Sequence, residues 1–229
     1  MTELNRRDFL QTTTAIAGLA VLGAGGAQAW GADAAPAPAQ QRNEALEKLL
    51  AQMEANRGQF LSVPRKDGQL LNLLVKATRA QSVLELGTSQ GYSTIWISRA
   101  LEETGGKLTT IELLAERTAL AKEHLAAAGL SHRVVFEQGD AHEIVPTLDG
   151  PFDFIFCDAD KEGQADYFNK LHPKKLMPGG LIAVHNAIRS RGAIRDYLDL
   201  LAKAAEYDTV IVSATMDDGF ALSYRRKLS

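Results

Sequence analysis

The stretch Val83-Leu-Glu-Leu-Gly-Thr-Ser-Gln-Gly-Tyr-Ser-Thr94 decides the fold of this 229-residue chain. An apolar run ends in a glutamate, two glycines follow, and the next residues have the character of a helix start. A buried strand that leads through a glycine turn into a helix N-terminus is how α/β proteins hold a nucleotide-like cofactor. The spacing differs from the dinucleotide pattern G-x-G-x-x-G, so the stretch predicts an α/β fold without indicating NAD.

Strands alternate with helices along most of the chain, as judged from short apolar runs and from apolar residues at helical spacing. The expected strands cover residues 82–86, 107–111, 134–137, 152–157, 181–184, 209–212 and 220–224. The expected helices cover residues 44–56, 67–80, 93–103, 115–128, 164–170 and 191–204. The pattern predicts a mostly parallel seven-stranded sheet with helices on both faces. Turns are expected at 178–180 and 217–219, and the second joins the last two strands in an antiparallel edge hairpin.

The bulk composition fits one globular domain of ordinary size with additional segments. Hydrophobic residues make up 45% of the chain, charged residues 23%, and the formal net charge is −3. This balance indicates no nucleic-acid partner, since such proteins usually carry a basic patch. No apolar run after Gly31 is long enough to span a bilayer. Cys157 is the single cysteine and lies in an apolar run, which predicts a buried thiol and no intramolecular disulfide.

The N-terminus has the composition of a secretory signal. Paired arginines at positions 6 and 7 precede an apolar stretch at 15–24 and a small-residue cleavage site at 27–29. The arginine pair followed by Phe9-Leu10 resembles a twin-arginine signal, which exports folded proteins. We expect export to the periplasm, or a cytoplasmic protein if the signal is not used; a membrane-anchoring or fortuitous N-terminus is the alternative. The expected organisation is a signal at 1–29, a disordered Ala- and Pro-rich linker at 30–41 and one folded domain at 42–229.

Short motifs follow one another from about Leu61 to the end of the chain. They are Val63, Gly68-Gln69, the pattern E-x-G-x-x-x-G-x-S at 85–93, Glu112, Gly139-Asp140-Ala141, Asp158-Ala-Asp-Lys161, Pro178-Gly-Gly180 and Asp218-Gly219. In order and spacing they resemble the caffeoyl-CoA and catechol O-methyltransferases. These are metal-assisted class I enzymes that use S-adenosylmethionine (SAM). The resemblance implies a Rossmann-like fold, SAM as cofactor, and methyl transfer to a hydroxyl of a small aromatic acceptor.

The strand ends of a doubly wound sheet face a common crevice, so several of these motif residues can converge on one cofactor. Gly87 lets the backbone approach the ligand, and Ser93 with its helix start can hold the methionine carboxylate. Glu112 can accept hydrogen bonds from the ribose hydroxyls, and Asp140 with Ala141 would address the adenine. Taken singly, Gly87 reads as a turn glycine, Glu112 as a solvated strand end and Asp140 as a helix N-cap. The expected cofactor set is Val63, Glu85, Gly87, Thr88, Ser93, Glu112, Asp140, Ala141 and Asp158.

Methyl transfer from sulfonium to oxygen needs an in-line nucleophile, preferably a phenolate, although a free phenol ionises only at about pH 10. A bound divalent cation lowers the pKa of the hydroxyl, and a nearby lysine can accept its proton. The resemblance places these parts at Asp158, a metal ligand, and Lys161, the general base. It also puts Asp160 at the mouth of the site. A charged loop that caps the next helix is the alternative reading.

His185 stands where the family carries an aspartate as a metal ligand, next to Asn186. A neutral imidazole suits transition ions better than Mg²⁺ or Ca²⁺. The expected metal set is therefore Asp158, His185 and Asn186, with a transition metal rather than Mg²⁺. Two alternatives stay open: His185 serves as a base or hydrogen-bond partner in a metal-free site, or it is a strand-end histidine beside a lost site.

Two other functions compete with the O-methyltransferase. One is a methyltransferase for a modified tRNA base, against which the acidic balance argues. The other is a non-catalytic SAM-binding protein with a degenerate metal site. We expect no stable membrane insertion after signal removal. The apolar stripe of the helix at 44–56 could pack in a homodimer, or instead on its own sheet.

Overall fold

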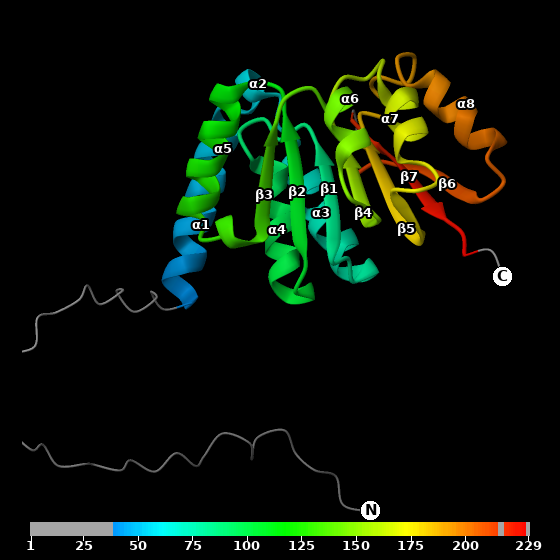
Figure 1. Ribbon diagram of the computed structural model, residues 1–229. Helices are drawn as coiled ribbons and strands as arrows, with labels where there is room; N and C mark the ends of the chain where they lie inside the picture. Colours follow the sequence, from blue (N-terminus) through cyan, green and yellow to red (C-terminus); the bar gives the residue numbers. More distant parts are fainter. Residues whose placement is uncertain (1–38, 215–217, 228–229) are drawn as a thin grey trace, which may run out of the picture. The chain divides into compact units, whose positions relative to one another are not determined.

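The computed structural model describes residues 39–214 and 218–227 (Figure 1). The expected signal at 1–29 lies outside the described residues, as do most of the expected linker and Asp217 of the expected hairpin turn. Helix α1 (Ala39–Ala55) begins inside the stretch expected to be linker, and earlier than predicted. The Gln40 amide donates to the Glu44 carboxylate one turn on (Nε2–Oε1 3.1 Å), which supports this first turn. Within the described ranges, no helix is both long and apolar enough to cross a membrane.

A seven-stranded sheet forms the centre of the described domain, in the order β3-β2-β1-β4-β5-β7-β6 (Figure 1). The strands are β1 (Ser82–Leu86), β2 (Lys107–Glu112), β3 (Val134–Gln138), β4 (Phe152–Cys157), β5 (Leu176–His185), β6 (Tyr207–Val212) and β7 (Phe220–Arg225). Strands β1 to β5 pair in parallel, whereas β7 runs antiparallel to both β5 and β6. The mostly parallel sheet with a C-terminal antiparallel hairpin is confirmed.

Helices cover both faces of this sheet, as predicted (Figure 1). One face packs against α1, α3 (Arg65–Thr78), α4 (Tyr92–Thr104) and α5 (Ala115–Ala127). The other packs against α6 (Ala141–Ile144), α7 (Gln164–Leu171) and α8 (Arg195–Lys203). The short helix α2 (Arg57–Phe60) lies between α1 and α3 in the chain. Neighbouring strand residues point to opposite faces, so Phe154 joins the first core and Ile155 the second. Cys157 is buried in the second core, as predicted, and burial raises the pKa of its thiol to about 12.

The apolar stripe of α1 packs within its own chain. Leu50 and Met53 are buried in the first core, and Leu46 and Leu49 pack against it. This is the alternative to a dimer contact that the sequence left open. A homodimer stays a prediction, without support from this stripe.

The prediction of a turn at Pro178–Gly180 was wrong, because these residues lie inside β5. The pairing of β5 with β4 shifts register between Phe152 and Phe154, which marks a bulge. A Cβ on Gly180 would lie 3.1 Å from the carbonyl oxygen of Asp153, so the glycine permits a close backbone approach within the bulged strand. Residues 177–180 fall between the positions of β5 that pair with Phe152 and Phe154, so they form an irregular part of the strand, where Gly179 has a φ of 90°.

The helix expected from residue 191 begins only at Arg195. Residues 186–194 form turns instead, and the first of them, Asn186, has a left-handed backbone with a φ of 59°. The segment after β5 is thus longer than the sequence indicated, and its Asn186, Arg189 and Ser190 line the cavity described next.

Candidate active site

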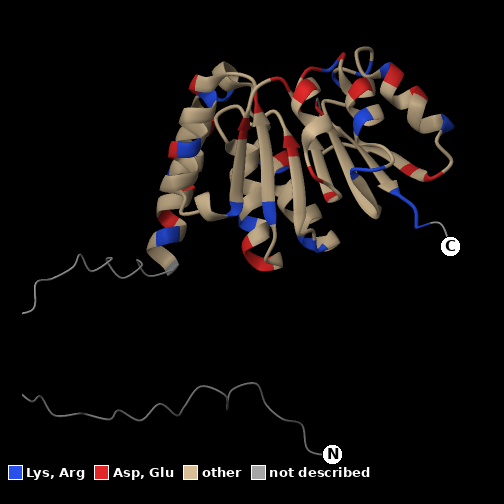
Figure 2. Cartoon of the chain, viewed as in Figure 1, with Lys and Arg blue, Asp and Glu red and all other residues tan. Residues whose placement is uncertain are grey.

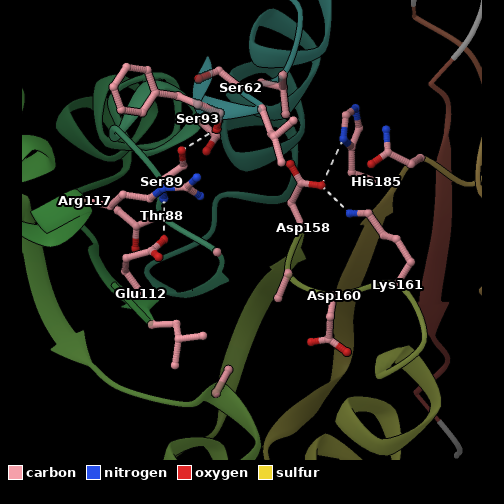
Figure 3. Close-up of a pocket in the computed structure, with 18 of the residues that line it drawn as sticks. Ser62, Thr88, Ser89, Ser93, Glu112, Arg117, Asp158, Asp160, Lys161 and His185 are labelled. Carbon is pink, nitrogen blue, oxygen red and sulfur yellow. Dashed lines mark hydrogen bonds and ion pairs between the residues drawn. The ribbon is translucent and has the colours of Figure 1, made fainter. Parts of the chain in front are cut away.

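A cavity of about 1,110 Å³ opens at the carboxyl ends of the central strands (Figure 3). It lies beside β1, where the strand order reverses between β2 on one side and β4 on the other. Doubly wound sheets bind their ligands at such a switch point. Acidic residues gather at and near the ends of these strands (Figure 2). The lining includes Gly87 after β1, Glu112 at the end of β2, Asp158 after β4 and His185 at the end of β5.

The turn between β1 and α4 brings the backbone against the end of β4. Gly87 has a φ of +96°, and a Cβ there would lie 3.0 Å from the carbonyl carbon and oxygen of Asp158. Only glycine suits both the left-handed backbone and this approach. The amides of Gly87 and Thr88 donate to the Ile111 carbonyl at 3.0 and 3.2 Å, which ties the turn to β2. Both predicted residues, Gly87 and Thr88, line the cavity.

Glu112 presents a carboxylate that the backbone holds in place. The Ser89 amide donates to its Oε2 at 2.7 Å and the Leu114 amide to its Oε1 at 3.1 Å. The residue is only 6% exposed, yet it lines the cavity from the end of β2 (Figure 3). A fixed carboxylate of this kind can accept hydrogen bonds from a ligand diol.

Glu85 was expected to bind the cofactor, but it is fully buried and does not line the cavity. Its buried carboxylate accepts hydrogen bonds from the hydroxyls of Ser93, Thr94 and Thr110 at 2.6 to 2.7 Å. Burial without a cationic partner raises its pKa to about 7, although the three hydroxyls oppose this shift. Ser93, which does line the cavity, is therefore held from below by Glu85.

The start of α6 forms another part of the cavity wall. Asp140 caps that helix, since its Oδ1 accepts the His142 amide at 2.8 Å, and it also lines the cavity together with Ala141. Asp140 therefore caps α6 and lines the cavity at the same time. Val63 lines the cavity as well, from the segment before α3. Sequence reasoning gave no role to His142, which lines the cavity and stacks on Tyr167 with ring centroids 4.1 Å apart.

The other half of the cavity centres on Asp158 (Figure 3). Its Oδ1 lies 2.6 Å from Lys161 Nζ and 3.1 Å from His185 Nδ1. Burial alone would raise the pKa of Asp158, but the neighbouring His185 and Lys161 hold it below the ordinary value. The structure therefore brings together three residues that the sequence assigned to the reaction.

His185 is bracketed by two carboxylates. Its Nε2 lies 2.8 Å from Oδ2 of Asp67, in addition to the Asp158 contact at Nδ1. Burial disfavours the charged ring, yet the two acids prevail and raise the pKa of His185 to about 9. Sequence reasoning missed Asp67. A signal existed, because Asp67 falls on the same buried helical stripe as Leu71 and Val75, where an acidic residue is out of place.

Asn186 turns to a different partner. Its Nδ2 donates to Oδ1 of Asp218 at 3.0 Å, and Asp218 also pairs with Arg57 at 3.3 Å. Arg189, whose side chain is 69% exposed, lies 3.7 Å from the same carboxylate. Asp160 sits at the mouth, where its Oδ1 accepts the Tyr167 hydroxyl at 2.5 Å.

The residues expected to hold a metal, Asp158, His185 and Asn186, each contact another side chain in this arrangement. One atom each of Asp67, His185 and Asp218 lies within 4.8 Å of the others, so distance alone would allow a shared ion. A metal-ligating imidazole must offer a nitrogen lone pair, however, and both ring nitrogens of His185 face carboxylates. In the structure, the His185 ring makes hydrogen-bond contacts with Asp67 and Asp158, and the choice among the three alternatives stays a prediction.

Known proteins resemble this chain over most of the described domain. The O-methyltransferase family model matches residues 37–215. A catechol O-methyltransferase of Niastella koreensis is 41% identical over 133 residues, which cover 56% of this chain and 59% of that enzyme, less than two thirds of its length. A catechol O-methyltransferase of Mycobacterium tuberculosis is 36% identical over 162 residues, or 70% of this chain and 73% of that enzyme.

Solved structures agree with this match. An O-methyltransferase from Bacillus cereus in complex with SAH superposes with a TM-score of 0.72 at 29% identity, over 80% of this chain and 91% of that one. The O-methyltransferase TomG from Streptomyces achromogenes, in complex with SAM, gives 0.70 at 32% identity, over 80% and 90%. The Rossmann-like SAM methyltransferase fold predicted from the sequence is confirmed.

Proposed function

The chain belongs to the O-methyltransferase family, and we propose that it transfers the methyl group of SAM to a hydroxyl of a small aromatic acceptor. One observation carries this proposal. A single cavity joins the Glu112 carboxylate, fixed by two backbone amides, to the group formed by Lys161, Asp158 and His185. Pockets for one small ligand usually measure about 300–1,000 Å³. At about 1,110 Å³, this cavity has room for a cofactor and a small acceptor together.

Ser93, Glu112 and Asp140 line one part of the cavity, which we call the cofactor half. Its polar groups match the two ends of SAM. We assign the ribose hydroxyls to Glu112, because its carboxylate is already oriented toward the cavity. The adenine goes to Asp140 and Ala141, and the methionine carboxylate to Ser93 at the positively polarised start of α4. Val63, Gly87, Thr88 and Asp158 line the space between these groups. Glu85 acts indirectly, by holding Ser93.

Asp158, Lys161 and His185 line the other part of the cavity, which we call the acceptor half. Its charged side chains can take up the proton of the acceptor and stabilise the phenolate. The acceptor hydroxyl loses a proton, its oxygen bonds to the methyl carbon, and the sulfur–methyl bond breaks. We assign acceptance of this proton to Nζ of Lys161, which lines the cavity. The transfer leaves an ammonium group beside the phenolate, still held by Asp158. The proposed reaction does not use the metal expected from the resemblance, because both ring nitrogens of His185 contact carboxylates.

Binding and turnover of the full chain test this proposal. Calorimetry with SAM and SAH measures the cofactor step, and transfer of a labelled methyl group to a panel of catechols and hydroxycinnamic acids measures the reaction. We expect binding of both cofactors and an O-methylated product. SAM binding without transfer to any acceptor would favour the non-catalytic alternative. Absence of SAM binding would overturn the assignment of the cavity.

We also propose, from the sequence alone, that residues 1–29 direct export to the periplasm. Cell fractionation with mass measurement of the mature chain tests this. A cytoplasmic chain that keeps residues 1–29 would contradict it.

A further inference from the structure

Three buried acids surround the end of β5, in the acceptor half of the cavity. Asp67 comes from α3, Asp158 follows β4, and Asp218 precedes β7. The side chain of Asp67 is fully buried, that of Asp218 is 6% exposed and that of Asp158 is 13% exposed. Burying three carboxylates so close together is costly unless positive charge compensates them.

Organic cations supply that compensation. The imidazole of His185 lies between Asp67 and Asp158, at 2.8 and 3.1 Å. Nζ of Lys161 adds a second nitrogen contact to Asp158 at 2.6 Å, and Arg57 pairs with Asp218 at 3.3 Å. Each acid therefore has a cationic side chain of this chain within ion-pair distance.

The hydrogen bonds of His185 decide the character of its ring. A neutral imidazole carries one N–H, so one of its two nitrogens would point a lone pair at a buried carboxylate. Two carboxylates are satisfied together only when both nitrogens donate. Aromatic rings also confine the imidazole, since Phe220 lies 5.0 Å and Phe156 6.3 Å away between ring centroids. The ring is packed in the orientation that serves the two acids.

We propose that His185, held between Asp67 and Asp158, takes the place of a divalent cation, so that this chain transfers methyl groups without a bound metal. The inference rests on the proposed function and concerns the same cavity. His185 and Lys161 both contact Oδ1 of Asp158, so the imidazole and, once Lys161 has accepted the proton, its ammonium group meet at one point of the acceptor half. There they stabilise the phenolate that forms in the reaction. Asp67 acts as a positioning residue, because it holds the ring without lining the cavity.

Metal binding and metal dependence of the full chain test the inference. The protein is treated with EDTA, desalted and titrated with Mn²⁺, Mg²⁺ and Zn²⁺, with bound metal measured by mass spectrometry and Mn²⁺ also by electron paramagnetic resonance. We expect no stoichiometric binding at up to about 1 mM of ion, and methyl-transfer rates with EDTA and with Mg²⁺ that agree within about twofold. About one equivalent of metal that is lost in His185→Ala, or a rate abolished by EDTA, would overturn the proposal.

Variants of His185 sharpen the test. His185→Asp removes the organic cation and adds a third carboxylate beside Asp67 and Asp158. We expect it to bind about one equivalent of Mn²⁺ and to lose at least about tenfold of its rate in EDTA. The matched control, His185→Asn, removes the ring without adding charge and should gain no metal. A folded His185→Asp that binds no metal would contradict the idea that the ring occupies a cation position.

The readouts separate this inference from the proposed function. Metal content and titration need no acceptor, so they decide the inference even if no methyl transfer is found. If His185→Asp fails to fold, as judged by circular dichroism, the metal titration of the unaltered chain still decides.

Discussion

The two halves of one cavity are built in different ways. In the cofactor half, the contiguous stretch 85–94 and Glu112 make contacts through backbone amides and hydroxyls. In the acceptor half, charged side chains from distant segments meet: Asp67 contacts His185 118 positions away, and Arg57 contacts Asp218 161 positions away. The difference teaches that local sequence can carry a cofactor site, whereas this acceptor site exists only in the packed chain.

Two buried carboxylates express the same contrast. Glu85 has only hydroxyl donors, and burial raises its pKa to about 7. Asp158 is also largely buried, but His185 and Lys161 overcome the effect of burial and lower its pKa. Neutral donors therefore leave a carboxylate that can hold a proton, and cations leave one that is ionised and ready to position charge for the reaction.

The largest effect is expected at Lys161, where a substitution should impair the reaction but not the binding of SAM. Lys161→Met should lower kcat by about 10²–10⁴-fold, because it removes the proposed proton acceptor, and should change the Kd for SAM by less than about threefold. Calorimetry and steady-state kinetics measure the two quantities. Lys161→Arg supplies a permanent cation that cannot accept a proton. If Lys161→Arg is fully active, the lysine serves as a charge and the assignment as a base is wrong.

The next effect is a pH dependence of stability from Glu85. Its folded-state pKa of about 7 exceeds the ordinary value of 4.5, so the folded protein holds the proton more tightly than the unfolded chain does. The stability contributed by protonated Glu85 is complete below about pH 4.5 and is lost as the pH rises through about 7. It amounts to roughly 3 kcal/mol.

Urea unfolding at pH 5, 6, 7 and 8 measures this effect. Other groups that titrate cancel when the chain is compared with Glu85→Gln, whose amide does not ionise. The free energy of unfolding of the unaltered chain, minus that of the variant, should fall as the pH rises. A difference that stays constant from pH 5 to pH 8 would show that Glu85 does not titrate in this range.

A smaller effect is expected at Glu112. Glu112→Gln replaces one acceptor oxygen by an NH₂ group that faces a backbone amide, so the Kd for SAM should rise by about 10- to 50-fold. Exposed Glu116, in the first turn of α5, offers the matched control Glu116→Gln, which should leave the Kd unchanged. Equal Kd values for both variants would remove Glu112 from the cofactor site.

The smallest effect is expected at the rim of the acceptor half. Arg189 is mostly exposed and lies 3.7 Å from Asp218, a geometry worth at most about 1 kcal/mol. Arg189→Ala should therefore change the acceptor KM by less than about threefold. A rise of more than about tenfold with an anionic acceptor, and not with a neutral one, would make Arg189 a substrate contact.

Sequence patterns predicted the fold, and most of the predicted cofactor residues line the cavity, because the signals for both are local. The strands at 82–86 and 152–157 form as predicted, and Gly87 and Glu112 stand at strand ends where the motif indicated. The same motif did not reveal that Glu85 points beneath the cavity. A spacing pattern gives the residue type, but the face to which a side chain turns depends on the packed sheet.

Long-range packing decided the rest. Pro178–Gly180 lie within β5, between the residues that pair with Phe152 and Phe154 of β4, although proline and glycine indicate a turn locally. The pairing of Asp67 with His185 joins a helix near one end of the domain to a strand near the other, and no local pattern encodes it.

By itself, the sequence determined a Rossmann-like SAM methyltransferase fold and the positions of Gly87 and Glu112 at strand ends beside the cavity, because hydrophobic periodicity and glycine geometry act over a few residues. It also placed Asp158 and His185 at strand ends and Lys161 in the loop after Asp158, but left the state of His185 open. Only the tertiary structure decided that His185 lies between Asp67 and Asp158. The physical reason is that burial makes each charge depend on its nearest partners, and those partners come together only when the chain is folded.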